Sequence, residues 1–86
     1  MVAGDSVSLN TVRSGESVQV RTIQGGCHVL GRLASLGFTP GALLKVVQNR
    51  GHGPLIVALR DTRVALGRGE AAKIWVEPLA GGNDGR

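Results

Sequence analysis

The fold of this chain is decided by the stretch Arg32-Leu33-Ala34-Ser35-Leu36-Gly37-Phe38-Thr39-Pro40-Gly41. Gly37 predicts the end of a helix, because glycine adopts at little cost the left-handed backbone conformation that closes helices. Phe38 then lies two residues past the last helical residue and can fold back on Leu33, which is the apolar contact of a Schellman motif. Thr39-Pro40-Gly41-Ala42 places proline second and glycine third, an order that suits a type II turn. The stretch therefore predicts a helix, a glycine stop, a turn and the entry to a strand.

The helix before this stop is predicted over residues 27–36. Val29, Leu33 and Leu36 fall within one stripe, spaced four and three residues apart, and we expect this stripe to face the core. Leu30 belongs to a second apolar edge, which is rotated away from the stripe. Two interpretations of that edge stay open from the sequence: it is the margin of the core, or it is a docking surface.

Short segments of alternating or continuous apolar residues predict five strands, and Gly67 to Ala72 predicts one further helical turn. The strands are predicted at residues 18–23, 43–48, 55–60, 63–66 and 73–77. A flat sheet of only five strands cannot bury both of its faces. We therefore predict a mainly β fold in which the strands form a small, partly open barrel, with one short helix after the first strand. We expect residues 1–8 to form a flexible leader, residues 9–78 the domain and residues 79–86 a flexible tail, with Leu9 and Val12 tucked onto the barrel.

Composition restricts the protein class. The chain has 86 residues, enough for one small domain, and its ten Lys and Arg residues against six Asp and Glu are scattered rather than clustered. Cys27 is the only cysteine, so an internal disulfide is excluded and no oxidising compartment is needed. The longest apolar run, residues 55–59, is far shorter than a membrane span. We therefore expect a cytoplasmic protein that does not span the membrane.

Catalytic and metal-binding patterns are weak. The sequence has no phosphate-binding loop and no motif of paired carboxylates, so we expect no enzymatic activity. Cys27, His28 and His52 are the candidate metal ligands, but Cys27 and His28 are adjacent, whereas structural metal sites usually space their ligands by two to four residues. We therefore predict no metal site and no resident cofactor. His52, between two glycines, is expected to make at most an adventitious divalent-metal contact between molecules.

An ordered set of short motifs extends over nearly the whole domain. It consists of Gly15-Glu16, Arg32-Leu33-x-x-Leu36-Gly37-Phe38-x-Pro40-Gly41, Pro54-Leu55, Arg63-Val64-Ala65-Leu66, Ala71-Ala72 and Ile74-x-Val76. In this order and spacing the set resembles the FeoA family, small SH3-like cytoplasmic proteins of bacterial ferrous iron uptake. The same module is similar to the C-terminal domain of DtxR-type repressors, but this chain has no room for their helix-turn-helix region. The resemblance implies a five-stranded SH3-like barrel that supports FeoB, a membrane ferrous iron transporter with a cytoplasmic GTP-binding region.

Three residues are the candidates for contact with such a partner. Trp75 is expected to point outward from the last strand, where it is either an interface anchor or a rim residue that shields the end of the barrel. Leu30 is the second candidate anchor, and Arg32, beside it, is expected to steer an acidic partner surface. These residues predict a protein-docking function for the chain.

Two rival functions follow from the same sequence. A basic SH3-like barrel can bind RNA or the ribosome, and such binding would weaken steeply with added salt. The scarcity of aromatic residues disfavours it, because single-stranded nucleic acid needs stacking platforms, so we expect no nucleic-acid partner. The other rival is a metal-sensing module separated from its repressor, which the poor set of metal ligands disfavours.

Overall fold

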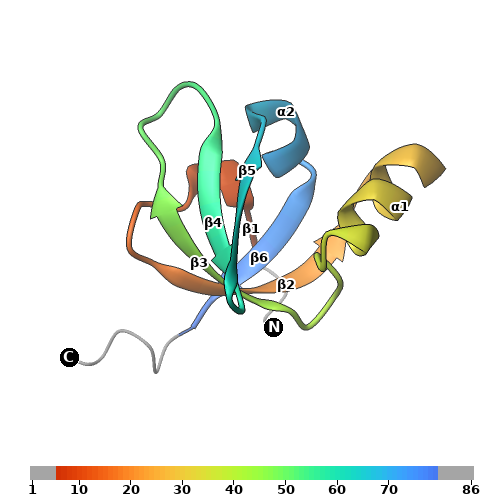
Figure 1. Ribbon diagram of the computed structural model, residues 1–86, viewed down its shortest axis with the longest axis horizontal. Helices are drawn as coiled ribbons and strands as arrows, with labels where there is room; N and C mark the ends of the chain where they lie inside the picture. Colours follow the sequence, from red (N-terminus) through yellow and green to blue (C-terminus); the bar gives the residue numbers. More distant parts are fainter. Residues whose placement is uncertain (1–5, 80–86) are drawn as a thin grey trace.

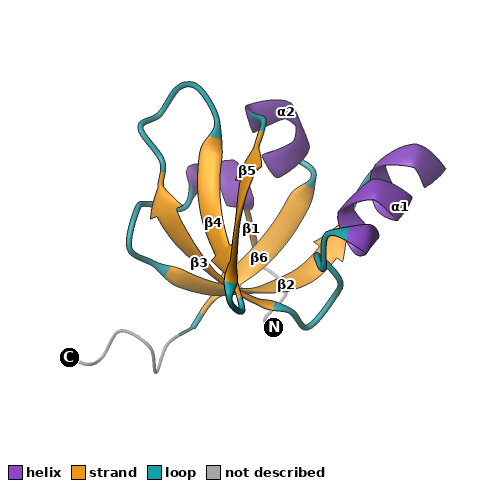
Figure 2. Cartoon of the chain, in the orientation of Figure 1, coloured by secondary structure: helices purple, strands orange, loops and turns teal. Residues whose placement is uncertain are grey.

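The computed structural model describes residues 6–79, which form one antiparallel sheet with three short helical segments (Figures 1 and 2). The strands follow the spatial order β1-β6-β2-β3-β4-β5. Their bounds are β1 (Val7–Ser8), β2 (Ser17–Ile23), β3 (Leu43–Gln48), β4 (Leu55–Leu59), β5 (Thr62–Leu66) and β6 (Ile74–Pro78). The helical segments are the 3-10 helix η2 (Leu9–Thr11) and the α-helices α1 (Cys27–Ser35) and α2 (Arg68–Ala71).

The mainly β fold predicted from the sequence is confirmed, with one strand more than expected. The additional strand is β1, whose Val7 and Ser8 lie opposite Val76 and Trp75 of β6. It falls inside the segment that the sequence predicts as a leader, because two residues are too short to show an alternating pattern. The remainder of that leader, residues 1–5, and residues 80–86 of the predicted tail lie outside the described residues.

The core fills the concave side of the curled sheet. Strand alternation supplies most of it, as in β4, where Leu55, Val57 and Leu59 are buried and the residues between them are partly exposed. Leu9 and Val12 are buried as expected, at 0% and 3% exposure. The buried apolar residues form one cluster: Leu9, Val12, Val18, Val20, Leu33, Phe38, Leu44, Val46, Leu55, Val57, Leu59, Leu66, Ala71, Ile74 and Val76.

The end of α1 is closed by a Schellman motif, as the sequence predicts. The Phe38 N–H donates to the Leu33 carbonyl at 2.9 Å, and the Gly37 N–H donates to the Ala34 carbonyl at 2.9 Å. Gly37 has a φ of 102°, in the left-handed region that favours glycine. Phe38 and Leu33 are both fully buried, so the motif also carries the helix end into the core.

The turn after the helix is formed as predicted. The Ala42 N–H donates to the Thr39 carbonyl at 2.9 Å, and Gly41 has a φ of 94°, which a type II turn requires at its third position. The turn delivers the chain into β3, which begins at Leu43.

A hydrogen-bonded hub around Asn49 ties three separate segments together. The Asn49 side-chain amide donates to the carbonyls of Asn10 and Val12, at 3.1 and 2.7 Å. Its oxygen accepts from the Gly51 N–H and from the Arg68 guanidinium, both at 3.0 Å. The same guanidinium donates to the Asn10 carbonyl at 2.8 Å, so η2, the loop after β3 and α2 are held at one end of the barrel.

Candidate protein-docking surface

Helix α1 stands at one side of the sheet (Figure 1). Few of its residues pack against the core. Leu33 is its only buried residue, and Val29 is partly buried against the core. Gly25 and Gly26 precede the helix and Gly37 follows it, so the element is joined to the barrel through short glycine-containing connections. The rest of its surface faces away from the core.

The second apolar edge of α1 is exposed. Leu30 exposes 40% of its surface, and Ala34, one turn later, is exposed as well. Leu30 is also absent from the partly buried residues that pack against the core. Of the two interpretations left open by the sequence, the geometry favours the one in which this edge is available to a partner.

Leu36 departs from the expected core stripe. It exposes 38% of its surface instead of packing inward. The reason is local. Leu36 is the C-cap of α1, and the chain reverses direction at the following Gly37, so that Phe38 and not Leu36 is buried in the core. The prediction that Leu36 faces the core is therefore wrong.

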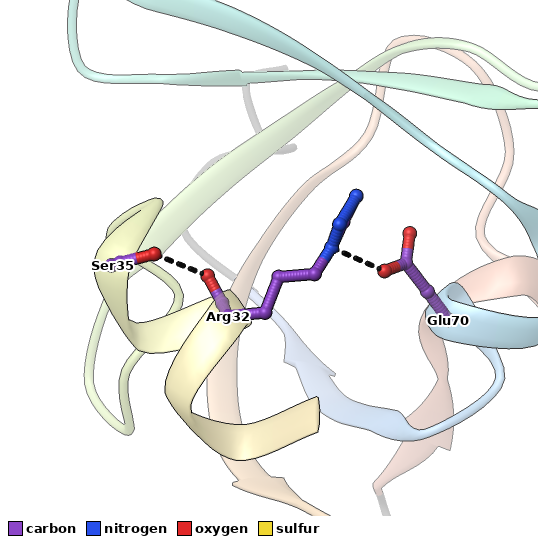
Figure 3. Close-up of polar contacts among 3 residues, drawn as sticks. All are labelled: Arg32, Ser35 and Glu70. Atoms are coloured by element: carbon purple, nitrogen blue, oxygen red, sulfur yellow. Dashed lines mark hydrogen bonds and ion pairs between the residues drawn. The ribbon is translucent and has the colours of Figure 1, made fainter. Parts of the chain in front are cut away.

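Arg32 lies on a different side of α1 from Leu30. Successive helical residues are rotated by about 100°, so two residues that are two positions apart point in nearly opposite directions. Figure 3 shows the Arg32 side chain reaching toward α2, where its Nε donates to Glu70 Oε2 at 2.9 Å. The Ser35 hydroxyl donates to the Arg32 carbonyl at 2.7 Å in the same turn (Figure 3). Arg32 therefore does not lie beside Leu30, and its guanidinium is paired with Glu70; its role as a steering charge stays a prediction.

The Arg32–Glu70 contact is an ion pair between two helices that the sequence separates widely. The side chains are 55% and 29% exposed, so the pair contributes less than about 1 kcal/mol to stability. Sequence reasoning did not identify Glu70, because no local spacing relates residues 32 and 70. The main effect of the ion pair is to orient the Arg32 side chain toward α2, and its contribution to the stability of the fold is small.

Trp75 points away from the core, as predicted, but it is half-buried. Its neighbours Ile74 and Val76 are fully buried, and its cross-strand partners are Ser8 on β1 and Thr22 on β2. The indole Nε1 is buried and meets no acceptor among the described residues, so it is not accessible as a donor to a partner. Trp75 is half-buried because the additional strand β1 lies beside it, with Ser8 directly opposite. The geometry therefore makes Leu30 the better candidate anchor of the two.

The candidate metal ligands are not gathered at one place. Cys27 and His28 are exposed at the start of α1, and His52 is exposed in the loop between β3 and β4. Within residues 6–79 there is no group of three or more His, Cys, Asp or Glu side chains that could hold a metal ion. None of the helices in this part of the chain has the length and apolar character needed to cross a membrane.

The FeoA domain matches residues 7–78 of the sequence. This chain belongs to the FeoA family. A relative named Fe(2+) transport protein A, from Methanocaldococcus jannaschii, is 40% identical over 72 residues, which are 84% of this chain and 87% of that protein. The family assignment covers nearly every described residue, including both elements that carry the candidate anchors.

Solved structures agree with this assignment. A crystal structure of an iron uptake regulatory protein (FeoA) has a TM-score of 0.82 and 34% sequence identity, and the match covers 86% of this chain and 99% of the FeoA chain. The zinc complex of Stenotrophomonas maltophilia FeoA, described as an SH3 domain protein, has a TM-score of 0.72 and 30% identity over 80% of this chain and 87% of its own. A manganese-dependent transcriptional repressor also matches, with a TM-score of 0.79 and 30% identity over 86% of this chain and 42% of its own. The SH3-like fold and the similarity to metal-dependent repressors are thus confirmed.

Proposed function

We propose that this chain is a cytoplasmic accessory protein of ferrous iron uptake that docks on the cytoplasmic part of a FeoB-type transporter through α1. Membership of the FeoA family supports a role in Fe²⁺ uptake, and this family is one of accessory transport proteins rather than enzymes. Docking, cytoplasmic location and recruitment to the inner membrane by the transporter are the parts that we add.

The observation that carries the proposal is the exposed edge of α1 formed by Leu30 and Ala34. A helix with one buried and one partly buried residue leaves most of its surface exposed. Burying a whole leucine side chain contributes about 1.5–3 kcal/mol, so burying the exposed 40% of Leu30 contributes about 1 kcal/mol before any contact with polar groups. A contact of this size suits docking that is reversible.

Docking would act on the transporter by selecting one of its states. A bound protein shifts an equilibrium only by the difference between its affinities for the two states. A projecting helix can supply such a difference if its apolar edge fits a groove that is open in one state. The proposal needs no reactive group in this chain.

The direct test is the variant Leu30→Gln. Because Leu30 lies outside the core, we expect an unchanged circular dichroism spectrum, together with about fivefold weaker capture of the transporter's cytoplasmic region and impaired iron uptake. Val47→Gln, at an exposed apolar residue of β3, is the matched control and should behave as the wild type. Capture should be measured with and without GTP.

Two outcomes contradict the proposal. If Leu30→Gln unfolds the protein, Leu30 is needed by the fold and the docking surface loses its anchor. If the variant folds and still supports capture and uptake as the wild type does, α1 is not the docking element.

A further inference from the structure

Three surface hollows meet at Arg60, the first of the two residues that connect β4 to β5. The largest, about 590 Å³, lies between Arg60 and the turn at residues 39–43. A second, of about 370 Å³, extends from Arg60 to Leu36 at the end of α1. The third, also about 370 Å³, extends from Arg60 to Lys45 and Leu79. We call these three hollows together the Arg60 groove.

The backbone at Arg60 is strained. Its φ is 59°, and it is the only non-glycine residue with a positive φ in the described part of the chain. Two-residue hairpin connections usually place glycine, asparagine or aspartate at such a position, because other side chains crowd the following carbonyl. An arginine held there against the backbone preference indicates that the side chain has a role at this site.

The groove and the strand residues beside it carry positive charge that the fold does not neutralise: Arg60 and Lys45 line the groove, and Arg63 lies outside its lining. Ala58 of β4 lies opposite Lys45 on β3 and opposite Arg63 on β5, so the two cations flank it on the outer face of the sheet. Among residues 6–79 the ion pairs are Arg21–Glu77 and Arg32–Glu70, and neither involves Lys45, Arg60 or Arg63. The adjacent Asp61 is not within ion-pair distance of any of the three.

Apolar surface lies between these charges. Leu43, in the largest hollow and the third, exposes 58% of its surface, more than any other large apolar residue described. Leu36, at the far end, exposes 38%. The floor beneath them is formed by Gly37 and the nearly buried Leu59. Cations around exposed leucines suit a ligand that is both acidic and apolar.

We propose that the Arg60 groove binds an acidic linear segment of a partner protein. Carboxylates of the segment would pair with Arg60, Lys45 and Arg63, and an apolar side chain would cover Leu43. The planar guanidinium of Arg60 suits bidentate pairing with a carboxylate. Nucleic acid fits less well, because no aromatic side chain lines the three hollows to stack on a base.

This surface is independent of the proposed docking of α1. It contains none of Leu30, Arg32 and Trp75, so it stands whether or not α1 contacts the transporter. A chain with both surfaces would contact a partner on the α1 edge and on the groove at the hairpin tip.

The test uses the full chain and a fluorescein-labelled dodecapeptide composed of Glu, Leu and Ser, with binding followed by fluorescence anisotropy at low salt. Arg60→Gly removes the charge and places at this site the residue that its φ favours, so the variant should fold at least as stably as the wild type. Its affinity for the peptide should fall about fivefold. Arg50→Gly makes the same change of charge in the loop at the other end of β4 and should leave the affinity unchanged.

Three further probes fix the chemistry of the occupant. A peptide with Ser in place of Leu, a peptide with Lys in place of Glu, and an oligothymidylate of equal charge should each bind more weakly than the acidic, apolar peptide. The proposal is overturned if wild-type protein shows no saturable binding of that peptide, or if Arg60→Gly binds it as tightly as Arg50→Gly does. Equal or tighter binding of any of the other three probes overturns it as well.

Discussion

Gly37 and Leu59 approach so closely that a Cβ atom at position 37 would lie 2.6 Å from Leu59 Cδ2. A glycine is therefore required at position 37 for two reasons. Its φ of 102° closes α1, and the absence of a Cβ atom lets the end of the helix pack on Leu59, the last residue of β4. Leu59 is 6% exposed and has little room to move. This contact positions the helix that carries the candidate docking edge.

We expect Gly37→Ala to destabilise the protein by about 2 kcal/mol, from the cost of a left-handed non-glycine residue together with the displacement of Leu59. The free energy of unfolding in urea measures the effect. Gly31→Ala is the control, because Gly31 is in the middle of α1 and a Cβ atom there meets nothing within 4 Å. It should stabilise the protein by roughly 0.5 kcal/mol through helix propensity. Equal effects of the two substitutions would contradict the role assigned to Gly37.

Asn49→Ala tests the hub that joins η2, the loop after β3 and α2. The substitution leaves the Asn10 and Val12 carbonyls without the amide donor and removes an acceptor of Arg68, so we expect a loss of about 2 kcal/mol. Urea unfolding again provides the measurement, with Gln24→Ala, at an exposed residue after β2, as the control. A loss no larger than that of the control would show that water replaces the hub without cost.

A titration with Fe²⁺ under anaerobic conditions tests the metal-binding capacity of the isolated protein. Because the described residues offer no group of three ligands, we expect calorimetry to show no one-to-one site tighter than micromolar. His52→Ala should leave the isotherm unchanged. A submicromolar one-to-one isotherm in the monomer would contradict the prediction.

Much of the fold could be predicted because its signals are local. The Schellman motif and the type II turn each depend on a few consecutive residues with glycine at the required position, and both are present as expected. β3 begins and ends at the predicted residues, 43 and 48, because the proline-glycine turn at residues 39–42 precedes it and the turn-forming residues 49–54 follow it.

The features that escaped prediction depend on distant residues. Arg32 meets Glu70 across 38 positions, and Trp75 is half covered in a sheet region completed by a two-residue strand that has no periodicity. The strained φ of Arg60 has no signature in its neighbours Leu59 and Asp61. The sequence predicts the second apolar edge of α1, but only the packing shows that Leu30 stays outside the core.

The most direct measurement of the central proposal is a nuclear magnetic resonance titration of isotope-labelled chain with the cytoplasmic region of a FeoB-type transporter. We expect the amide signals that shift or broaden first to be those of α1, Cys27–Ser35, centred on Leu30, and Leu30→Gln to abolish these changes. If the transporter region leaves the α1 signals unchanged, or perturbs the loop after β3 instead, α1 is not the docking element and the account fails.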